Sequence, residues 1–282
     1  MKEKIVKAVQ DGRIIAIIRG FAPDVCLNLA EAYFKGGIRM VEVTFNQKAP
    51  DTWKDTSAAI SAIKARFANA VHVGAGTVLT EEQLAMCQDA GGEYMITPNV
   101  NPALIRSCVS RGLVAMPGAL TPSEAVDAWE AGASFVKIFP AGSLGPGYVK
   151  AIRAPLSHIP FLAVGGISPD NVAEFMRVGC VGAGVGGNLT NKEWIAAGAW
   201  DKIADVARQL VERYAVKVDT ELHAEVLERF HRLDLAPYKG FINPMMLPVY
   251  DKEGNICDIQ LNYSESYAHQ MLRYSSEYGT LI

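Results

Sequence analysis

The 282-residue chain lacks long apolar segments, and it has little net charge. No hydrophobic run approaches the roughly 20 residues that a membrane-spanning helix requires, so we expect no membrane partner. The 27 Lys and Arg residues nearly balance the 30 Asp and Glu residues, which gives no electrostatic basis for binding nucleic acid. Charges are spaced through the N-terminal segment, so we do not expect it to be a signal peptide.

Cysteines are few, and their pattern is not that of a disulfide framework. There are five of them, scattered and without a Cys-x-x-Cys pair, which predicts free thiols in a reducing, cytoplasmic environment. The histidines show no metal-ligand spacing, and His223 lies in a His-Ala-Glu triplet instead of a zinc-binding motif. We therefore predict neither a metal nor a cofactor.

One pattern repeats from residue 1 to about 214: a short apolar run is followed by a stretch with helical spacing. Eight units in about 200 residues are typical of a (β/α)8 barrel. Polar residues end nearly every run, which favours this closed α/β TIM barrel, with an N-terminal helix, over a doubly wound open sheet. The expected strands are 14–19, 40–44, 71–74, 94–97, 113–116, 135–138, 161–164 and 182–185, and expected helices include 24–35, 52–66, 81–90, 102–110 and 123–131.

The repeating pattern ends after the eighth unit. We therefore predict a barrel domain at residues 1–216 and a C-terminal α+β appendage of unknown role at 217–282. The appendage is expected to contain a helix at 219–233, a hairpin at 249–263 and a helix at 266–278. Because about 65 residues cannot hold a large core, packing or oligomerisation is its expected role.

Lys137 is the first candidate for catalysis. Side chains alternate along a strand, so Lys137 shares a face with Phe135 and Phe139, while Val136 and Ile138 face the helices. This alternation predicts that Lys137 points into the barrel. Desolvation lowers a lysine pKa and makes the free amine available to attack a carbonyl group. The alternative is that Lys137 only caps a strand end and points to solvent.

Glu42 is the second candidate. The same alternation in the run 40–44 places Glu42 and Thr44 inside the barrel, with Val41 and Val43 against the helices. A carboxylate near a buried amine can move the protons that carbinolamine, imine and enamine chemistry requires. A structural ion pair between two strands would produce the same sequence pattern, so the pair alone does not establish catalysis.

Two glycine pairs supply a third element. Gly165-Gly166 and Gly186-Gly187 follow the seventh and eighth expected strands. Glycine lets backbone N–H groups approach an anion closely, and loops at these two places form the recurring phosphate site of such barrels. The pairs therefore predict a phosphate-binding site.

These segments resemble those of 2-keto-3-deoxy-6-phosphogluconate aldolases, which also act on 4-hydroxy-2-oxoglutarate. The resemblance covers about residues 1–213, and each motif lies on its expected strand in the expected order. The matching segments are Glu42-Val43-Thr44, Gly74-Ala75-Gly76-Thr77-Val78, Thr97-Pro98, Met116-Pro117-Gly118, Lys137-Ile138-Phe139-Pro140-Ala141 and Gly165-Gly166-Ile167.

The resemblance implies a metal-independent, homotrimeric class I aldolase of carbohydrate metabolism, as in the Entner–Doudoroff pathway. It implies that Lys137 forms an imine with the C2 carbonyl of a 2-keto acid and that Glu42 is the general acid/base. The substrate would be 2-keto-3-deoxy-6-phosphogluconate, 4-hydroxy-2-oxoglutarate or both, giving pyruvate with glyceraldehyde 3-phosphate or glyoxylate. The implied substrate-binding residues are Arg19, Thr77 and Pro98 around the pyruvyl carboxylate, Phe139 over the enamine, and Gly165, Gly166, Gly187 and Asn188 around the phosphate.

The chain departs from this family pattern at three places. Asn46 stands where many members have an arginine, and the missing guanidinium weakens the expectation of tight phosphate binding. Asn188 stands where many have a serine, and its amide can still donate a hydrogen bond to an anion. The third is the tail, whose segments 241–244 and 267–274 faintly resemble the C-terminal end of bacterial dipeptidyl peptidase III-like proteins. The alternatives are a phosphate-binding barrel isomerase or synthase, and a non-catalytic assembly scaffold.

Overall fold

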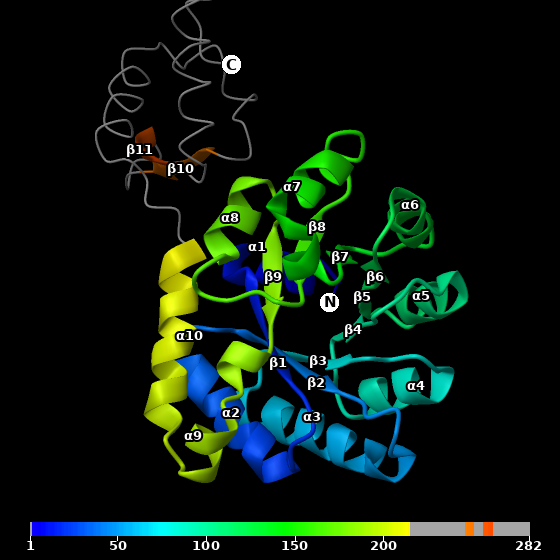
Figure 1. Cartoon of the computed structure of the whole chain (residues 1–282), viewed down its shortest axis with the longest axis vertical. Helices are drawn as coiled ribbons and strands as arrows, with labels where there is room; N and C mark the ends of the chain where they lie inside the picture. Colours follow the sequence, from blue (N-terminus) through cyan, green and yellow to red (C-terminus); the bar gives the residue numbers. More distant parts are fainter. Residues whose placement is uncertain (1, 215–245, 251–255, 262–282) are drawn as a thin grey trace, which may run out of the picture. The chain divides into compact units, whose positions relative to one another are not determined.

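The computed structural model describes residues 2–214, 246–250 and 256–261, and the chain divides into two compact units, Met1–Tyr214 and Ala215–Ile282. The described strands of the first unit are all parallel and form one sheet with the order β5-β4-β3-β2-β1-β9-β8-β7-β6 (Figure 1). The strands are β1 (Ile14–Ile18), β2 (Met40–Thr44), β3 (His72–Gly76), β4 (Tyr94–Ile96), β5 (Val114–Met116), β6 (Gly118–Ala119), β7 (Val136–Ile138), β8 (Phe161–Val164) and β9 (Gly182–Val185).

The sheet closes on itself at Pro117, which separates β5 from β6. Proline has no N–H to donate to a ladder, so the strand is interrupted there. Across the gap, the Ser134 N–H donates to the Ala115 carbonyl (3.0 Å) and the Lys137 N–H donates to the Pro117 carbonyl (2.8 Å). These bonds join the β5–β6 segment to β7, so eight strand positions form a ring. The predicted barrel is confirmed, although its fifth strand is two short pieces.

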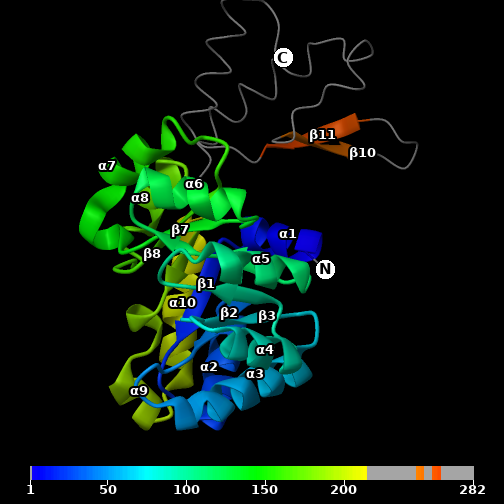
Figure 2. The same ribbon diagram turned by 90° about the vertical axis from the view of Figure 1, so that its right-hand side faces the viewer.

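The helices surround the strands of the first unit (Figures 1 and 2). Those expected at 24–35, 52–66, 81–90, 102–110 and 123–131 are present within one or two residues of their expected bounds. Helix α10 packs along α2 and completes this outer layer. The helices are α1 (Lys2–Gly12), α2 (Pro23–Lys35), α3 (Trp53–Phe67), α4 (Glu81–Asp89), α5 (Pro102–Ser110), α6 (Pro122–Glu130), α7 (Ala141–Arg153), α8 (Val172–Arg177), α9 (Lys192–Ala196) and α10 (Trp200–Tyr214), with 3-10 turns η1 (Pro50–Thr52) and η2 (Gly187–Leu189).

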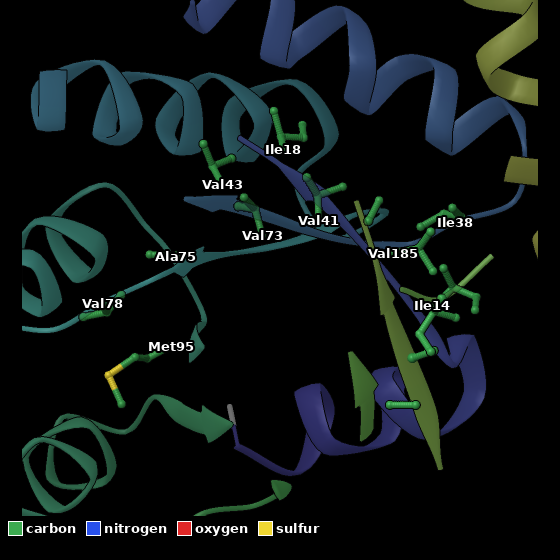
Figure 3. Close-up of a cluster of buried hydrophobic side chains, with 14 of the residues drawn as sticks. Ile14, Ile18, Ile38, Val41, Val43, Val73, Ala75, Val78, Met95 and Val185 are labelled. Atoms are coloured by element: carbon green, nitrogen blue, oxygen red, sulfur yellow. The ribbon is translucent and has the colours of Figure 1, made fainter. Parts of the chain in front are cut away.

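Strand alternation separates the core into an outer and an inner layer. Side chains such as Val41, Val43, Val73 and Val185 point from the strands toward the helices (Figure 3). The inner layer fills the barrel itself and includes Ile15, Met40, Tyr94, Val114, Met116, Phe135 and Leu162. Because burying apolar surface contributes about 25 cal/mol per Å², both layers stabilise the barrel, and the inner one leaves no open pore.

Helix α1 covers one end of the barrel. Its apolar residues Ile5 and Val9 are fully buried and belong to the inner layer of side chains. The helix contacts strands β1, β2, β5 and β9. The predicted N-terminal helix is confirmed, and its position leaves the opposite, carboxyl-terminal end of the barrel for the site.

In the second unit the structure describes an antiparallel pair, β10 (Met246–Tyr250) and β11 (Ile256–Leu261), in which Met246 is opposite Leu261. The predicted hairpin is therefore confirmed, with a first strand that begins three residues earlier than expected. The helices expected at 219–233 and 266–278 lie outside the described residues. Among the helices that the structure describes, none is long and apolar enough to cross a membrane.

Candidate active site

Lys137 lies on the inner face of β7, as the alternation of side chains predicts. Its neighbour Phe135 belongs to the inner layer, whereas Val136 and Ile138 belong to the outer one. Lys137 is 7% exposed, and its Nζ lies 4.9 Å from the centre of the Phe139 ring. The alternative in which Lys137 points to solvent is therefore wrong.

Glu42 lies on the inner face of β2 and is 3% exposed. Its carboxylate occupies space that Gly76 of β3 leaves open, because a Cβ atom added at Gly76 would lie 1.7 Å from Glu42 Oε1. The strand β3 extends two residues beyond its predicted end, and this extension brings Gly76 into register with Thr44. A glycine at position 76 is thus a steric requirement of the buried carboxylate.

Burial and three charges determine the protonation states of the pair. Burial lowers the pKa of the Lys137 amine, the Glu42 carboxylate opposes this effect, and the Arg19 guanidinium lowers the pKa further. Burial raises the pKa of Glu42, against the opposing effect of Lys137 and Arg19. Both shifts favour the neutral forms, which are a free amine that can act as a nucleophile and a carboxyl group that can donate a proton.

Arg19 and Thr77 meet beside this pair. Arg19 follows β1, and its Nη2 donates to the Thr77 hydroxyl at 3.4 Å. Thr77 follows β3 and has a φ of +54°, a conformation that a β-branched residue rarely adopts and that costs on the order of 1–3 kcal/mol. The structure therefore brings together two of the residues expected at the substrate carboxylate.

Pro98 and Thr44 lie close to these groups in the barrel. Pro98 packs closely against Gly118, because a Cβ atom added at Gly118 would lie 2.6 Å from the Pro98 carbonyl oxygen. Gly118 is in turn the strand partner of Lys137. The Thr44 hydroxyl is buried and makes no hydrogen bond within the described residues. It is available to a bound substrate or water.

Phe139 connects the lysine to the first glycine pair. Phe139 is 39% exposed, and its ring packs against Gly165. A Cβ atom added at Gly165 would lie 3.0 Å from Phe139 Cε2. Gly165 and Gly166 have φ angles of +88° and +74°, which favour glycine. The Gly142 N–H, at the start of α7, donates to the Gly165 carbonyl at 2.7 Å.

Asn188 joins the two glycine-containing loops. Its Nδ2 donates to the Ile167 carbonyl at 3.0 Å, and Asn171 Nδ2 donates to the Gly166 carbonyl at 2.9 Å. One of the two hydrogens of the Asn188 amide is therefore used within the protein. Asn46, at the position of the missing arginine, is exposed; its Oδ1 accepts from the Lys48 N–H (3.0 Å), and its carbonyl accepts from Trp53 Nε1 (2.9 Å).

Sequence reasoning missed two glutamines near Thr77. Gln83 on α4 is fully buried, and Gln47 follows β2. The only sequence signal is that Gln83 stands three residues after Thr80, the spacing of a capping box, and Thr80 does cap α4 by accepting from the Gln83 N–H (3.2 Å). That signal explains the helix start and does not reveal the contacts of the amide.

A (β/α)8 barrel with a lysine and a glutamate buried inside it, next to glycine-rich loops, has the features of an aldolase. The family model for KDPG and KHG aldolase matches residues 5–206. The chain belongs to this family and is therefore a lyase. Among the described residues, no group of three or more His, Cys, Asp or Glu side chains could hold a metal ion.

Named relatives support the same family. The chain is 37% identical to the 2-dehydro-3-deoxy-6-phosphogalactonate aldolase of Escherichia coli over 71% of its own length and 94% of that protein. It is 33% identical to the 2-dehydro-3-deoxy-phosphogluconate aldolase of Treponema pallidum, over 74% and 96% of the two chains.

Solved structures are similar over the same region. One, described as native KDPGal, is 37% identical with a TM-score of 0.64, over 71% of this chain and 93% of the other. The KDPG aldolase of Legionella pneumophila, with pyruvate captured as a covalent carbinolamine, is 26% identical with a TM-score of 0.66 over 74% and 98%. A 3-hexulose-6-phosphate synthase, at 16% identity and a TM-score of 0.56, shares the fold alone.

We expect Gly76→Ala to disrupt the site, because the added methyl group would displace the Glu42 carboxylate. Aldol cleavage should fall by at least about tenfold, and urea unfolding should show a loss of about 1–3 kcal/mol from overpacking. Gly12→Ala is the matched control, since nothing lies within 4 Å of a Cβ there. Full activity and stability of Gly76→Ala would contradict the steric role of Gly76.

Proposed function

We propose that this chain is a class I aldolase that cleaves 4-hydroxy-2-keto acids to pyruvate and an aldehyde through an imine on Lys137. The observation that carries the proposal is the burial of Lys137 and Glu42 within the same barrel interior. The cytoplasmic location expected from the sequence remains a prediction, as does the division into a catalytic domain at 1–216 and an appendage at 217–282.

In the proposed reaction, the neutral Lys137 amine attacks the C2 carbonyl to form a carbinolamine. The protonated Glu42 carboxyl group gives its proton to the departing hydroxyl group, so water leaves and a protonated imine and a Glu42 carboxylate remain. Glu42 then takes the proton of the C4 hydroxyl as the C3–C4 bond breaks. The bonding electrons move into the iminium group, and an aldehyde leaves. The enamine that remains is protonated at C3, and water releases pyruvate and the free amine. No metal is needed, because the protonated imine accepts the electron pair.

Arg19 and Thr77 are proposed to bind the carboxylate of the pyruvyl group. A guanidinium with a neighbouring hydroxyl supplies charge-assisted hydrogen bonds to such an anion. Pro98 and the Phe139 ring would complete the apolar surroundings of C2 and C3, since Pro98 packs against the strand partner of Lys137 and Phe139 lies next to the amine. The exposed position of Arg19 fits a substrate that enters from the carboxyl-terminal end.

The two glycine-containing loops are proposed to bind the distal phosphate through backbone N–H groups of Gly166, Ile167, Gly187 and Asn188. In a trans peptide the C=O and the following N–H point in opposite directions. The carbonyls of Gly165 and Gly166 are held by Gly142 and Asn171, so the N–H groups of Gly166 and Ile167 point away from those partners. Within the described residues, these two N–H groups donate to no other backbone group.

The proposed substrates are six-carbon 2-keto-3-deoxy-6-phospho acids, with 4-hydroxy-2-oxoglutarate as a further substrate. Relatives at 37% and 40% identity are named as phosphogalactonate aldolases, and relatives at 29–35% as phosphogluconate or KHG/KDPG aldolases. The two phosphorylated acids differ in configuration at C4. We therefore include the galactonate form, which the sequence alone did not suggest.

Incubation with pyruvate and borohydride should leave a reduced adduct on the peptide that contains Lys137. Lys137→Ala should form no adduct and should lose activity by at least about 10³-fold, because the nucleophile is absent. Mass spectrometry of the digested protein measures the adduct. Lys150→Ala, which removes an exposed lysine on α7, should behave as the parent protein.

Glu42→Gln provides a second arm of this experiment. Its adduct should still form, while cleavage falls by about 10²-fold or more because the general base is lost. The Glu42 carboxylate raises the pKa of Lys137, so its removal should move the pH midpoint of adduct formation to a lower value. A folded parent protein that forms no adduct would refute the imine mechanism, and a midpoint that rises in Glu42→Gln would refute the assigned charge coupling.

The phosphorylated acids should be cleaved with a kcat/KM at least about tenfold above that of 4-hydroxy-2-oxoglutarate, which corresponds to about 1.4 kcal/mol. Gly166→Ala should reduce this preference, because its φ of +74° and a Cβ 3.2 Å from Gly142 Cα strain the loop. Steady-state kinetics with both C4 epimers measures the preference. An equal kcat/KM for all three acids would mean that the loops do not bind phosphate.

We also propose that the chain forms a homotrimer. A designed cube-shaped cage, made by fusing symmetric oligomeric domains, is 36% identical over 76% of this chain with a TM-score of 0.65. Sedimentation equilibrium should give a mass about three times the 30.5 kDa of one chain. A single species at 30.5 kDa at micromolar concentration would contradict the proposal.

A further inference from the structure

Thr77 has an unfavourable backbone conformation, and two hydrogen-bonded glutamine side chains bond to the backbone of Thr77 and Leu79. A β-branched residue with a φ of +54° persists only where its surroundings fix it, and such residues concentrate at functional sites. Gln47 Nε2 donates to the Thr77 carbonyl at 2.6 Å, and Gln83 Nε2 donates to Gln47 Oε1 at 2.9 Å. Gln83 Oε1 accepts from the Leu79 N–H at 2.7 Å.

The groups at the two ends of this series of hydrogen bonds, the Leu79 N–H and the Thr77 carbonyl, fix the direction of each bond between them. The Leu79 N–H can only donate, so Gln83 must present its oxygen there and its NH₂ group to Gln47. Gln47 must then present its oxygen to Gln83 and its own NH₂ group to Thr77, whose carbonyl can only accept. Because both ends impose the same orientation, the two amides cannot flip without losing hydrogen bonds.

This series of hydrogen bonds connects three separate segments at the candidate site. Gln83 is on α4 and fully buried, Gln47 is in the segment after β2, and Thr77 follows β3. At its far end, the Thr77 hydroxyl lies 3.4 Å from Arg19 Nη2. A fixed backbone at Thr77 therefore determines where its hydroxyl lies relative to the guanidinium.

We propose that Gln47 and Gln83 are positioning residues that hold Thr77 in place to bind the substrate carboxylate. This inference rests on the proposed function, in which Thr77 and Arg19 bind that carboxylate. The two glutamines do not touch the substrate. Their effect reaches it only through the backbone of Thr77, and each depends on the other because they act in series.

The test uses the full-length chain with Gln47→Met, Gln83→Met and the double substitution. Methionine keeps the approximate length of the side chain and removes its hydrogen bonds. The carboxylate contacts are present in both the ground state and the transition state, so their weakening should raise KM by about tenfold and leave kcat within about threefold. Gln88→Met is the matched control, because Gln88 is an exposed residue of the same helix as Gln83, and within the described residues its side chain bonds only to Arg111.

The double substitution separates positioning from a general loss of structure. If the two glutamines act in series, its KM should lie within about twofold of the worse single variant. Three results would each overturn the proposal. The first is a double variant in which the KM increases of the two single variants multiply, the second is an unchanged KM in both single variants, and the third is an equal change of KM in Gln88→Met. If Gln83→Met does not fold, the exposed Gln47→Met still tests the bond to Thr77.

The borohydride adduct distinguishes this inference from the proposed function. A parent protein that forms no adduct on Lys137 refutes the proposed function itself. A parent that forms the adduct, together with glutamine variants of unchanged KM, refutes only the positioning role. The pH midpoint of adduct formation at saturating pyruvate should be the same in Gln47→Met and the parent, since neither glutamine carries a charge.

Discussion

The Lys137 amine loses its hydration inside the barrel, and the protonation states in the rest of the site depend on that desolvation. An isolated charge in such an interior would cost several kcal/mol, so Lys137 either becomes neutral or must be paired. Glu42 is the only carboxylate that affects the pKa of Lys137 among the described residues, and it is itself raised in pKa by burial. Burial thus limits the ionisation of both groups, while the charge of each favours the ionisation of the other. The barrel interior therefore holds a nucleophile and a proton carrier together in apolar surroundings.

The barrel interior accommodates the Glu42 carboxylate and the Tyr94 ring because β3 has glycine at two inward positions. On the inner face of β3, Gly74 leaves room for the Tyr94 ring and Gly76 leaves room for the Glu42 carboxylate, since a Cβ atom at either would lie within 2.3 Å of its neighbour. Tyr94 then donates its hydroxyl to the Val41 carbonyl at 2.6 Å. Packing and chemistry therefore depend on the same strand, because a larger residue there would displace both an inner-layer aromatic ring and the candidate base.

Strand alternation was sufficient to predict the inward positions of Lys137 and Glu42, because a period of two needs only the local sequence. Alternation could not predict that Pro117 divides the fifth strand. The position of the break depends on which carbonyl groups accept hydrogen bonds from the neighbouring strand β7, and these partners are distant in the sequence. Alternation also could not reveal the roles of Gln83 and Asn188. Their amides bond to groups of other segments, the Gln47 side chain and the Ile167 carbonyl, and contacts between separate loops leave no periodic trace in the sequence.

Both ends of the proposed substrate site depend on amide side chains that hold backbone groups. At the carboxylate end Gln47 bonds to the Thr77 carbonyl, and at the phosphate end Asn188 bonds to the Ile167 carbonyl. An amide carries no charge, so it cannot replace the guanidinium absent at Asn46 as a direct partner of an anion. It can fix a carbonyl in one direction, and the N–H of the same peptide then points the other way. The Asn171 bond to the Gly166 carbonyl acts in this way on the Ile167 N–H, whereas the Ser168 N–H of the peptide that Asn188 holds already donates to Asn171 Oδ1 at 2.9 Å. Binding at the phosphate end would consequently depend on the rigidity that Asn171 gives the first loop more than on charge.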